Sequence, residues 1–291
     1  IAFDTKTNQL VIAYNSSDID IIKGNIIKNI SEIKNSTIVG NKNIFSIYCK
    51  DGIAYVATGI GIVLIDLEKY QIKDTWYIGS NATQLSIYAI ATANNAFYAA
   101  TELGLKKALQ NSNLSNHANW QTIAFNNLPV QQVASIGNQI VVLQNNSVWI
   151  EQATGFNLLY TKPGFKINSI ERSNNHLLIC EQSNNSANVI EINTNGVIIN
   201  TIQSANNIVQ PTSAINNNAV TWIADNINGL LAFSAGKIEQ YLPNGPKGIS
   251  TGEMVIRDNE VIVAAGSLNT WQNTNSKNGV NTYANNEWKN I

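Results

Sequence analysis

Residues 52–79, GIAYVATGIGIVLIDLEKYQIKDTWYIG, decide the fold class of this chain. They contain three short apolar runs, IAYVATG, IVLIDLE and IKDTWYIG, separated by turns that contain Gly or polar residues. Short β-branched runs bounded by Gly, Asn or Asp are typical of strands and hairpins. With IFSIYC ahead of the turn at Asp51-Gly52, the stretch predicts an antiparallel sheet of four strands.

The same pattern recurs along the chain. The segments LVIAYN, AYVATG, FYAATE, VVLQN, LLICEQ, WIADN and IVAAGS align at intervals of 37 to 44 residues. Their equivalent positions are Ala13, Ala57, Ala100, Leu143, Cys180, Ala224 and Ala265. A period of ~40–45 residues is that of a four-stranded propeller blade. The sequence therefore predicts an all-β fold, a seven-bladed β-propeller of four-stranded antiparallel blades.

The second and third units match best, because Tyr55, Thr58 and Gly61 recur as Tyr98, Thr101 and Gly104, each 43 residues later. Trp76 recurs as Trp120 after a one-residue insertion. Small aligned residues are expected near the propeller axis, where blades converge. The aromatic side chains expected to fill the wider spaces between blades are Tyr55, Trp76, Tyr98 and Trp120.

The chain is expected to form one domain over residues 1–291, because no low-complexity linker divides it. The predicted blades lie near 1–40, 41–80, 81–125, 126–163, 164–205, 206–245 and 246–291. No segment sustains a helical apolar period over three turns. One short helical turn is expected in LSNHANW, after Ser112 or Ser115.

Composition excludes several classes of protein. Charged residues make up 13% of the chain, and about one residue in six is Asn, which favours turns. The net charge of -1 argues against nucleic acid as a partner, because phosphate binding needs a basic surface. No apolar run reaches the ~20 residues of a transmembrane helix, and no signal peptide opens the chain. We expect a mature or excised segment.

The residues with the most reactive side chains favour structural roles. His117 lies in a polar loop and His176 in an Asn-rich turn, so solvated turns are favoured over a metal site, which usually needs three or four ligands. Cys49 ends a strand without any cysteine-protease signature, and Cys180 occupies a register filled elsewhere by Ala. Both are expected to pack, and a Cys49–Cys180 bridge is not expected because it would link non-adjacent blades.

Two segments resemble calcium loops weakly, at residues 4–8 and 225–229. Both lack the full set of alternating oxygen ligands and the closing acidic residue, so hairpin turns are favoured. Asp66, Glu68 and Asp74 are expected on solvated strand faces. The Gly59-x-Gly61 segment is not a phosphate loop, because no helix follows it. No catalytic, cofactor or metal site is therefore predicted.

Trp222 and Trp271 have no equivalent in the best-matched units. Trp222 is expected in the core. Trp271 lies in an Asn-rich insertion, SLNTWQNTNSKNG, where core packing or a covering loop competes with a recognition role. Aromatic side chains beside amides suit contacts with sugars or proteins. Trp271, Asn269 and Asn273 are therefore the candidate ligand- or partner-binding residues.

Residues 1–44 and 52–79, continuing to FYAATELGLKKA and the Asn119-Trp120 pair, resemble the N-terminal propeller of the PorZ family of type IX secretion accessory proteins. The resemblance is specific over residues 1–124 and architectural from 125 to 291. It implies a Bacteroidetes-type cell-surface or secreted protein, associated with the outer membrane after transit through the periplasm. It also implies similarity to two-component-regulator propellers.

The resemblance implies partners as well: a sortase and outer-membrane components of the attachment complex. Anionic lipopolysaccharide would bind mainly through a C-terminal domain that is not identifiable here. The favoured hypothesis is a non-enzymatic scaffold without cofactors that supports sortase recruitment and cargo attachment. The alternative is a sensor-like propeller that binds a surface glycan or peptide near its axis. An enzyme, such as a propeller lyase or glycosidase, would need clustered carboxylates or histidines at one face.

Overall fold

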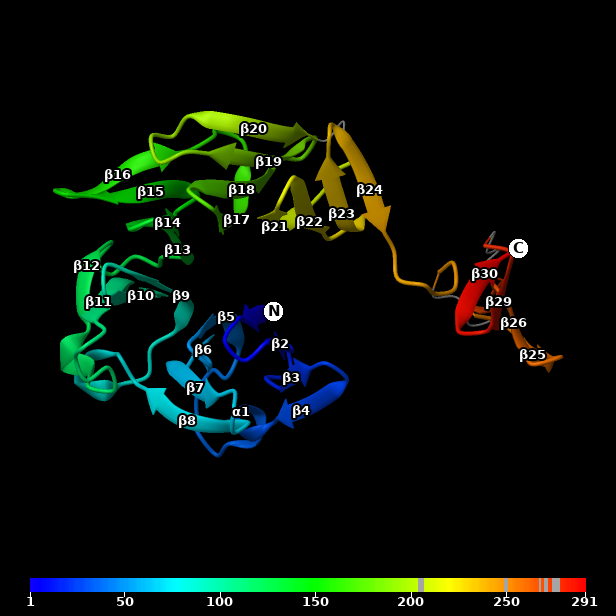
Figure 1. Cartoon of the computed structure of the whole chain (residues 1–291), viewed down its shortest axis with the longest axis horizontal. Coiled ribbons are helices and arrows are strands. Elements are labelled where there is room, and N and C mark those ends of the chain that lie inside the picture. The colour runs from blue at the N-terminus through cyan, green and yellow to red at the C-terminus, as the bar shows by residue number, and fades with distance from the viewer. Residues whose placement is uncertain (204–206, 249–250, 267, 270–271, 274–277) are drawn as a thin grey trace. The chain divides into compact units, whose positions relative to one another are not determined.

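The computed structural model describes residues 1–203, 207–248, 251–266, 268–269, 272–273 and 278–291. Its strands form seven four-stranded antiparallel sheets and one small two-stranded sheet. Within the described residues, no helix is long and apolar enough to cross a membrane. The structure thus confirms the all-β, seven-bladed propeller fold class (Figure 1).

The sheets follow the chain in order. The first three are β1 (Ala2–Asp4), β2 (Gln9–Ala13), β3 (Ile19–Lys23) and β4 (Ile26–Ile30); β5 (Ile44–Lys50), β6 (Ile53–Thr58), β7 (Ile62–Asp66) and β8 (Gln71–Trp76); and β9 (Ile87–Ala93), β10 (Ala96–Thr101), β11 (Gly104–Leu109) and β12 (Gln121–Ala124). The next two are β13 (Gln132–Ile136), β14 (Gln139–Gln144), β15 (Ser147–Gln152) and β16 (Gly155–Tyr160); and β17 (Lys166–Ser173), β18 (His176–Gln182), β19 (Ala187–Ile192) and β20 (Ile198–Gln203). The last two are β21 (Pro211–Asn217), β22 (Val220–Asp225), β23 (Gly229–Ser234) and β24 (Lys237–Tyr241); and β25 (Met254–Arg257), β26 (Glu260–Ala264), β29 (Val280–Ala284) and β30 (Glu287–Asn290), with β27 (Leu268–Asn269) and β28 (Gln272–Asn273) pairing separately. We number these sheets as blades 1 to 7.

Helical structure is short. A single α-helical turn, α1 (Glu32–Asn35), follows β4, and 3-10 turns occupy Ser80–Ala82 and His117–Asn119. The last confirms the predicted turn, but its cap is the Asn116 side chain, which accepts a hydrogen bond from Ala118 N, rather than a serine. Neither α1 nor the turn at Ser80–Ala82 was predicted.

The chain divides into two compact units, Ile1–Glu239 with blades 1 to 6 and Gln240–Ile291 with blade 7. In the first unit the blades follow one another, with the inner strands β5, β9, β13, β17 and β21 side by side around its centre (Figure 1). The prediction that residues 1–291 form one domain stays a prediction.

The strand pairing confirms the repeat. In blades 2 to 6 the aligned residues lie on the second strand, and each pairs with an inner-strand residue of the same register. These pairs are Ala57 with Ser46, Ala100 with Ala89, Leu143 with Gln132, Cys180 with Ser169 and Ala224 with Ser213. The aligned residues therefore lie one strand away from the centre, not on the strand nearest the axis.

The core lies between neighbouring blades. Five clusters of buried apolar residues separate blades 1 to 6, one for each neighbouring pair. On β6, side chains alternate between two of them: Ala54 and Val56 face blade 1, whereas Ala57 faces blade 3. The second strand of a blade thus contributes to both of its interfaces, so small residues there allow close packing.

Aromatic rings fill the interface between blades 2 and 3, as predicted. The Tyr55 ring lies 5.7 Å from Trp76 and 5.1 Å from Phe97, and Trp76 lies 6.3 Å from Trp120. Tyr98 instead is fully buried between blades 3 and 4. Off-parallel rings at such distances add stabilisation beyond the area they bury.

Asparagine makes the turns. Of the twenty described non-glycine residues with positive φ, thirteen are Asn. Pairs such as Asn94-Asn95 and Asn145-Asn146 have positive φ at both residues, as two-residue hairpins of the right twist require. The high Asn content therefore follows from the many short hairpins, whose turns need residues that adopt positive φ.

A buried polar residue follows the aligned position in blades 2 to 6. These residues are Thr58, Thr101, Gln144, Glu181 and Asp225. In blades 2 and 3 the threonine closes the hairpin: Thr58 Oγ1 donates to Gly61 O at 2.8 Å and accepts from Ile60 N at 3.2 Å. Thr101 repeats both bonds with Gly104 O and Leu103 N.

The glycine of this hairpin is required by space as well as by φ. Gly61 has φ 145, and an added Cβ would lie 2.5 Å from Trp76 O. The recurrence of Thr and Gly in the two best-matched units is thus a recurrence of one turn geometry.

Asp225 occupies the same register in blade 6. Its carboxylate is 5% exposed and accepts four backbone N–H bonds, at 2.8 to 2.9 Å, from Val209, Gln210, Ile227 and Asn228. Burial raises the pKa of Asp225, but the four donors outweigh burial and hold it below its usual value.

We expect Thr58→Val to lower the free energy of unfolding by about 1–2 kcal/mol, because the buried Ile60 N–H loses its acceptor while the shape is kept, and Gly61 O retains only the Thr58 N–H. Thr101→Val should behave alike. Thr58→Ser, which keeps the hydroxyl, is the matched control in urea unfolding. Equal stability of Thr58→Val and the native chain would contradict this role.

The lowered pKa of Asp225 stabilises the fold above the pKa of the unfolded carboxyl, about 3.9, and this contribution is lost as pH falls through the lower folded value. We expect Asp225→Asn to reduce stability at pH 7 by about 2 kcal/mol, because two backbone donors lose their acceptor. It should also flatten the acid limb of a plot of unfolding midpoint against pH. Asp258→Asn, at an exposed turn, is the control; an unchanged acid limb in Asp225→Asn would contradict the assignment.

Candidate functional site

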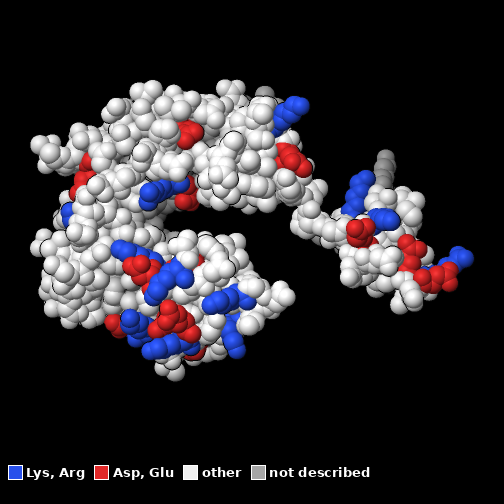
Figure 2. All heavy atoms as spheres, viewed as in Figure 1, with Lys and Arg blue, Asp and Glu red and all other residues white. Residues whose placement is uncertain are grey.

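The inner strands of the first unit enclose a cavity of about 810 Å³. It is lined by residues of β5, β9, β13, β17 and β21, and the space-filling view shows the hollow between them (Figure 2). We call it the central cavity. Its volume is in the range of small-molecule sites.

The wall of the central cavity is made of open strand edges. Each inner strand lies at the end of its sheet and pairs with one strand only. Such edges present backbone N–H and C=O groups that the sheet does not use. Some are used between blades: Ile170 N donates to Gln132 Oε1 and Ile167 N to Asn146 Oδ1, both at 2.7 Å, and Pro211 O accepts from Asn168 Nδ2 at 2.8 Å. The others can bond to a ligand or to water.

A β-bulge recurs at the same register of these strands. The pairing shifts by one residue at Phe45, Tyr88, Asn168 and Thr212. In blade 4, Gln131 N donates to Leu143 O although Gln132 is the partner of Leu143. Bulges turn a side chain out of the regular alternation and are frequent beside functional sites.

The bulges place two aromatic rings on the wall of the cavity. Phe45 and Tyr88 meet edge to face with ring centroids 5.0 Å apart, and Phe45 is 40% exposed. Further along the same strands, the Tyr48 and Thr92 hydroxyls form a 2.6 Å hydrogen bond. The cavity thus offers aromatic surface beside hydroxyl and backbone groups.

Glu171 is the acidic side chain of the cavity wall. It lies on β17, and its Oε1 is 3.4 Å from Ser213 Oγ on β21. Burial raises the pKa of Glu171, and the Ser213 hydroxyl offsets part of that effect. The sequence analysis did not select Glu171. Glu171 aligns with Tyr48 of blade 2, because each lies two residues after the aligned inner-strand position of its blade. This alignment was the sequence signal that could have identified Glu171.

Of the predicted recognition residues, Asn269 and Asn273 belong to the second compact unit, whereas residues of the first unit line this cavity. Trp271 lies outside the described residues. The backbones of Asn269 and Asn273 belong to the β27–β28 hairpin, in which Asn269 pairs with Gln272 and Leu268 with Asn273. Trp222 is half-buried on β22, where it pairs with Ile215 and Ala232.

The cysteines pack as predicted. Cys180 is buried between blades 5 and 6 and Cys49 is half-buried against the cluster between blades 1 and 2; both are free thiols. Burial raises the pKa of each to about 12, so neither is a thiolate at neutral pH.

The histidines differ from one another. His117 is half-buried in the short turn His117–Asn119. His176 begins β18 and is not a free turn residue: its Nδ1 lies 3.0 Å from Glu191 Oε1. The same Glu191 oxygen is 3.3 Å from Asn216 Nδ2, so this group joins blades 5 and 6. Among the described residues, no three His, Cys, Asp or Glu side chains are grouped as metal ligands.

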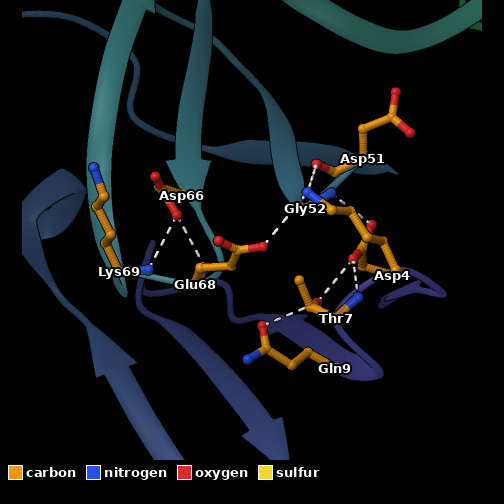
Figure 3. A network of polar contacts seen from close by, with 9 residues as sticks. Asp4, Thr7, Gln9, Asp51, Gly52, Asp66, Glu68 and Lys69 are labelled. Atoms are coloured by element: carbon orange, nitrogen blue, oxygen red, sulfur yellow. Dashed lines mark hydrogen bonds and ion pairs between the residues drawn. The ribbon is translucent and has the colours of Figure 1, made fainter.

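The carboxylates of the two calcium-like segments bond to their own turns, as the hairpin interpretation predicts. Asp4 Oδ2 accepts from Thr7 N and Thr7 Oγ1 at 2.8 Å, and Asp4 Oδ1 accepts from Gly52 N at 3.2 Å (Figure 3). Asp4 therefore links blade 1 to the first hairpin of blade 2. Burial raises its pKa, but these hydrogen bonds outweigh burial and lower it overall. The second segment contains Asp225, described above.

Asp66, Glu68 and Asp74 are also in local contacts. Asp66 Oδ1 accepts from Glu68 N and Lys69 N at 3.0 Å (Figure 3). Glu68 pairs with Lys6 at 3.4 Å. Asp74 Oδ2 accepts from Trp76 Nε1 at 3.0 Å. These contacts fix turns and rings and do not form a pair of carboxylates across a cleft.

Comparison with known proteins gives two findings. Residues 1–121 match the family model of the N-terminal β-propeller domain of PorZ from the type IX secretion system. Among curated proteins, no sequence matches. The family match covers blades 1 and 2 and most of blade 3, where the repeat is also clearest.

Solved structures share the fold. PorZ of Porphyromonas gingivalis, described as an essential bacterial surface component of the type IX secretion system, matches with a TM-score of 0.69 and 22% identity. The match covers all of this chain and 38% of that one. The extracellular domain of a putative hybrid two-component system from B. thetaiotaomicron matches with a TM-score of 0.61 and 11% identity, over 100% of this chain and 46% of that one. The WD40 β-propeller domain of Doa1 matches with a TM-score of 0.58 and 13% identity, over 90% of this chain and 87% of that domain.

The chain spans well under half the length of the PorZ structure that it matches. Family match, structural likeness and the seven sheets agree with one another. The chain is therefore a β-propeller similar in fold to PorZ, and its residues 1–121 match the PorZ N-terminal propeller domain.

Proposed function

We propose that this chain is a non-enzymatic scaffold of a type IX secretion attachment complex at the cell surface. In this role its loops and blade edges contact partner proteins, a sortase and an outer-membrane component, and so support sortase recruitment and cargo attachment. The observation that carries the proposal is the match of residues 1–121 to the PorZ N-terminal propeller.

The chemistry of the described residues supports a scaffold. The carboxylates of Asp4, Asp66 and Asp225 accept backbone hydrogen bonds, and both cysteines are protonated in the core. Outer surfaces differ in charge: charged side chains gather over the first two blades in the view of Figure 2, and few lie over β16 and β20. Uneven charge of this kind favours one orientation of a bound protein over others.

We expect deletion of this propeller from the full-length protein to abolish co-purification of the sortase, the outer-membrane partner or both. The reason is that the surface which contacts them is removed. Because a deletion can disturb neighbouring domains, direct binding of the 291-residue chain to each purified partner is measured in parallel. Undiminished co-purification together with no binding by the isolated chain would refute the scaffold role.

A second candidate function is a sensor-like propeller that holds a glycan or peptide in the central cavity. The cavity of about 810 Å³, with the Phe45–Tyr88 pair beside open strand edges, supports it. Aromatic faces and backbone groups together suit ligands that have both apolar faces and hydroxyl or amide groups.

For this candidate we expect at least one surface glycan to raise the melting temperature of the chain, since a ligand that binds only the folded state stabilises it. Phe45→Ala should remove that shift. Phe3→Ala, at a 52% exposed side chain that does not line the cavity, should preserve it. A screen of surface glycans in which none shifts the melting temperature would eliminate glycan binding.

A further inference from the structure

Two neighbouring blade interfaces contain equivalent tyrosines that differ in how deeply they are buried. Tyr55 on β6 and Tyr98 on β10 are equivalent in the repeat, 43 residues apart. Tyr98 lies in the interface between blades 3 and 4 and is fully buried. Tyr55 lies in the interface between blades 2 and 3 and is half-buried. The difference has its cause in two side chains that surround each ring.

An ion pair closes the interface around Tyr98. The Tyr98 hydroxyl donates to Glu151 Oε2 at 3.3 Å, and Lys107 Nζ lies 5.0 Å from the centroid of the Tyr98 ring. Lys107 Nζ is in turn 3.8 Å from Glu151 Oε1. The phenol thus has a carboxylate acceptor, and a cation partly neutralises that carboxylate.

The interface around Tyr55 lacks both charged groups. Leu64 pairs with Tyr55 across the strands, as Lys107 pairs with Tyr98. Ala108 pairs with Phe97 in blade 3, and Glu151 is its equivalent in blade 4, 43 residues later. Leu64 and Ala108 are shorter and uncharged, so no side chain of this kind closes the space beside Tyr55.

The result is a groove of about 470 Å³ between blades 2 and 3, which we call the Tyr55 groove. Its floor is aromatic and aliphatic, with Phe97, Leu64 and Leu114. Among the described residues, no hydrogen-bond partner of the Tyr55 hydroxyl is found, whereas the Tyr48 hydroxyl beside it bonds to Thr92. Burial raises the pKa of Tyr55, so its hydroxyl is a donor at neutral pH.

Two lysines line the Tyr55 groove, although the position equivalent to Lys107 is occupied by Leu64. Lys50 and Lys73 both line it, and Lys50 Nζ lies 5.8 Å from the Phe97 ring centroid. Within the described part of the chain, neither lysine forms an ion pair. Of the two carboxylates on the lining, Asp74 accepts from Thr75 N and Trp76 Nε1, and Asp51 is exposed.

We propose that the Tyr55 groove binds an extended acidic segment of a partner protein. The carboxylate of an Asp or Glu in that segment takes the place that Glu151 holds beside Tyr98. It accepts a hydrogen bond from the Tyr55 hydroxyl and is neutralised by Lys50 and Lys73, while a neighbouring apolar side chain covers the half-buried Leu114. A phenol and two unpaired cations around an apolar floor complement an acidic and apolar peptide in charge and in polarity.

A peptide fits this groove better than a sugar acid does. The floor residues Phe97 and Leu64 are both buried, so little aromatic face is open for stacking by a sugar ring. The half-buried aliphatic side chain of Leu114 instead matches a leucine-like neighbour of the acid. The inference goes beyond the proposed scaffold role and does not depend on which complex the chain joins.

The test uses the blocked dipeptide acetyl-leucyl-glutamyl-amide as the probe, titrated into the 291-residue chain and followed by backbone amide NMR shifts. We expect saturable shifts at Tyr55, Phe97 and Leu114, and much weaker shifts with acetyl-leucyl-glutaminyl-amide, which lacks the charge. Tyr55→Phe should raise the dissociation constant about tenfold, since it removes a hydrogen bond to a charged group. Lys50→Gln and Lys73→Gln should also weaken binding.

The repeat provides matched controls. Tyr98→Phe removes the equivalent hydroxyl from the closed interface and should leave the dissociation constant unchanged. Asp51→Asn removes the exposed carboxylate beside the groove and should tighten binding by about two- to threefold, because a surface charge contributes modestly. Leu64→Lys with Ala108→Glu installs the ion pair of the next interface and should abolish binding.

Several outcomes would overturn the proposal. Absence of saturable shifts with the acidic dipeptide would do so, as would equal binding of the glutaminyl probe. A Tyr98→Phe loss as large as that of Tyr55→Phe would show a general loss of structure and not a site. Saturable shifts with glucuronate but not with the dipeptide would assign the groove to an acidic sugar instead. If the double variant does not fold, Tyr55→Phe and Asp51→Asn decide the result, and neither depends on sortase binding.

Discussion

A four-stranded sheet has two faces, and in this protein each face can be buried only against a neighbouring blade. The five apolar clusters of the first unit lie between blades, not inside them. On β6 the alternation of side chains sends Ala54 and Val56 to one interface and Ala57 to the other. Small residues on the second strand are needed because two sheets approach that strand from opposite sides.

Close packing of sheets also buries polar groups at the strand ends, and these must be bonded where they lie. Thr58 and Thr101 close their own hairpins, whereas Asp225 accepts four backbone N–H groups. Glu181 is fully buried and bonds to Tyr160, Lys162 and Asn188. Several of the titratable side chains therefore maintain the fold.

The two candidate sites lie where either the regular strand pairing or the repeat is interrupted. The recurring bulge puts Phe45 and Tyr88 on the wall of the central cavity, where regular alternation would have placed other side chains. In the interface between blades 2 and 3, Leu64 and Ala108 stand where the next interface has a lysine and a glutamate. An exact repeat would bury Tyr55 and Tyr98 equally. The sequence difference between the blades therefore leaves the space and the unpaired donors beside Tyr55.

The sequence by itself determined the strands, their grouping into seven sheets of four strands and the turns, because these depend on neighbours within a few residues. Alternating apolar residues and Asn or Gly at left-handed positions were enough to align Ala57 with Ala100 and to place the Asp51-Gly52 turn. The resemblance of residues 1–124 to the PorZ propeller was also visible in the sequence and agrees with the family match.

Only the tertiary structure decided which side chains meet across blades. The hydrogen bond from Tyr98 to Glu151 joins residues 53 positions apart, and the bond from Ile170 to Gln132 joins residues 38 positions apart, beyond the reach of local pattern. For the same reason the sequence analysis did not select Phe45, Tyr88 and Glu171, which line the cavity, and the recognition role of Trp271, Asn269 and Asn273 stays a prediction. Contacts of this kind depend on how sheets pack, and packing follows from side-chain volume at both interfaces together.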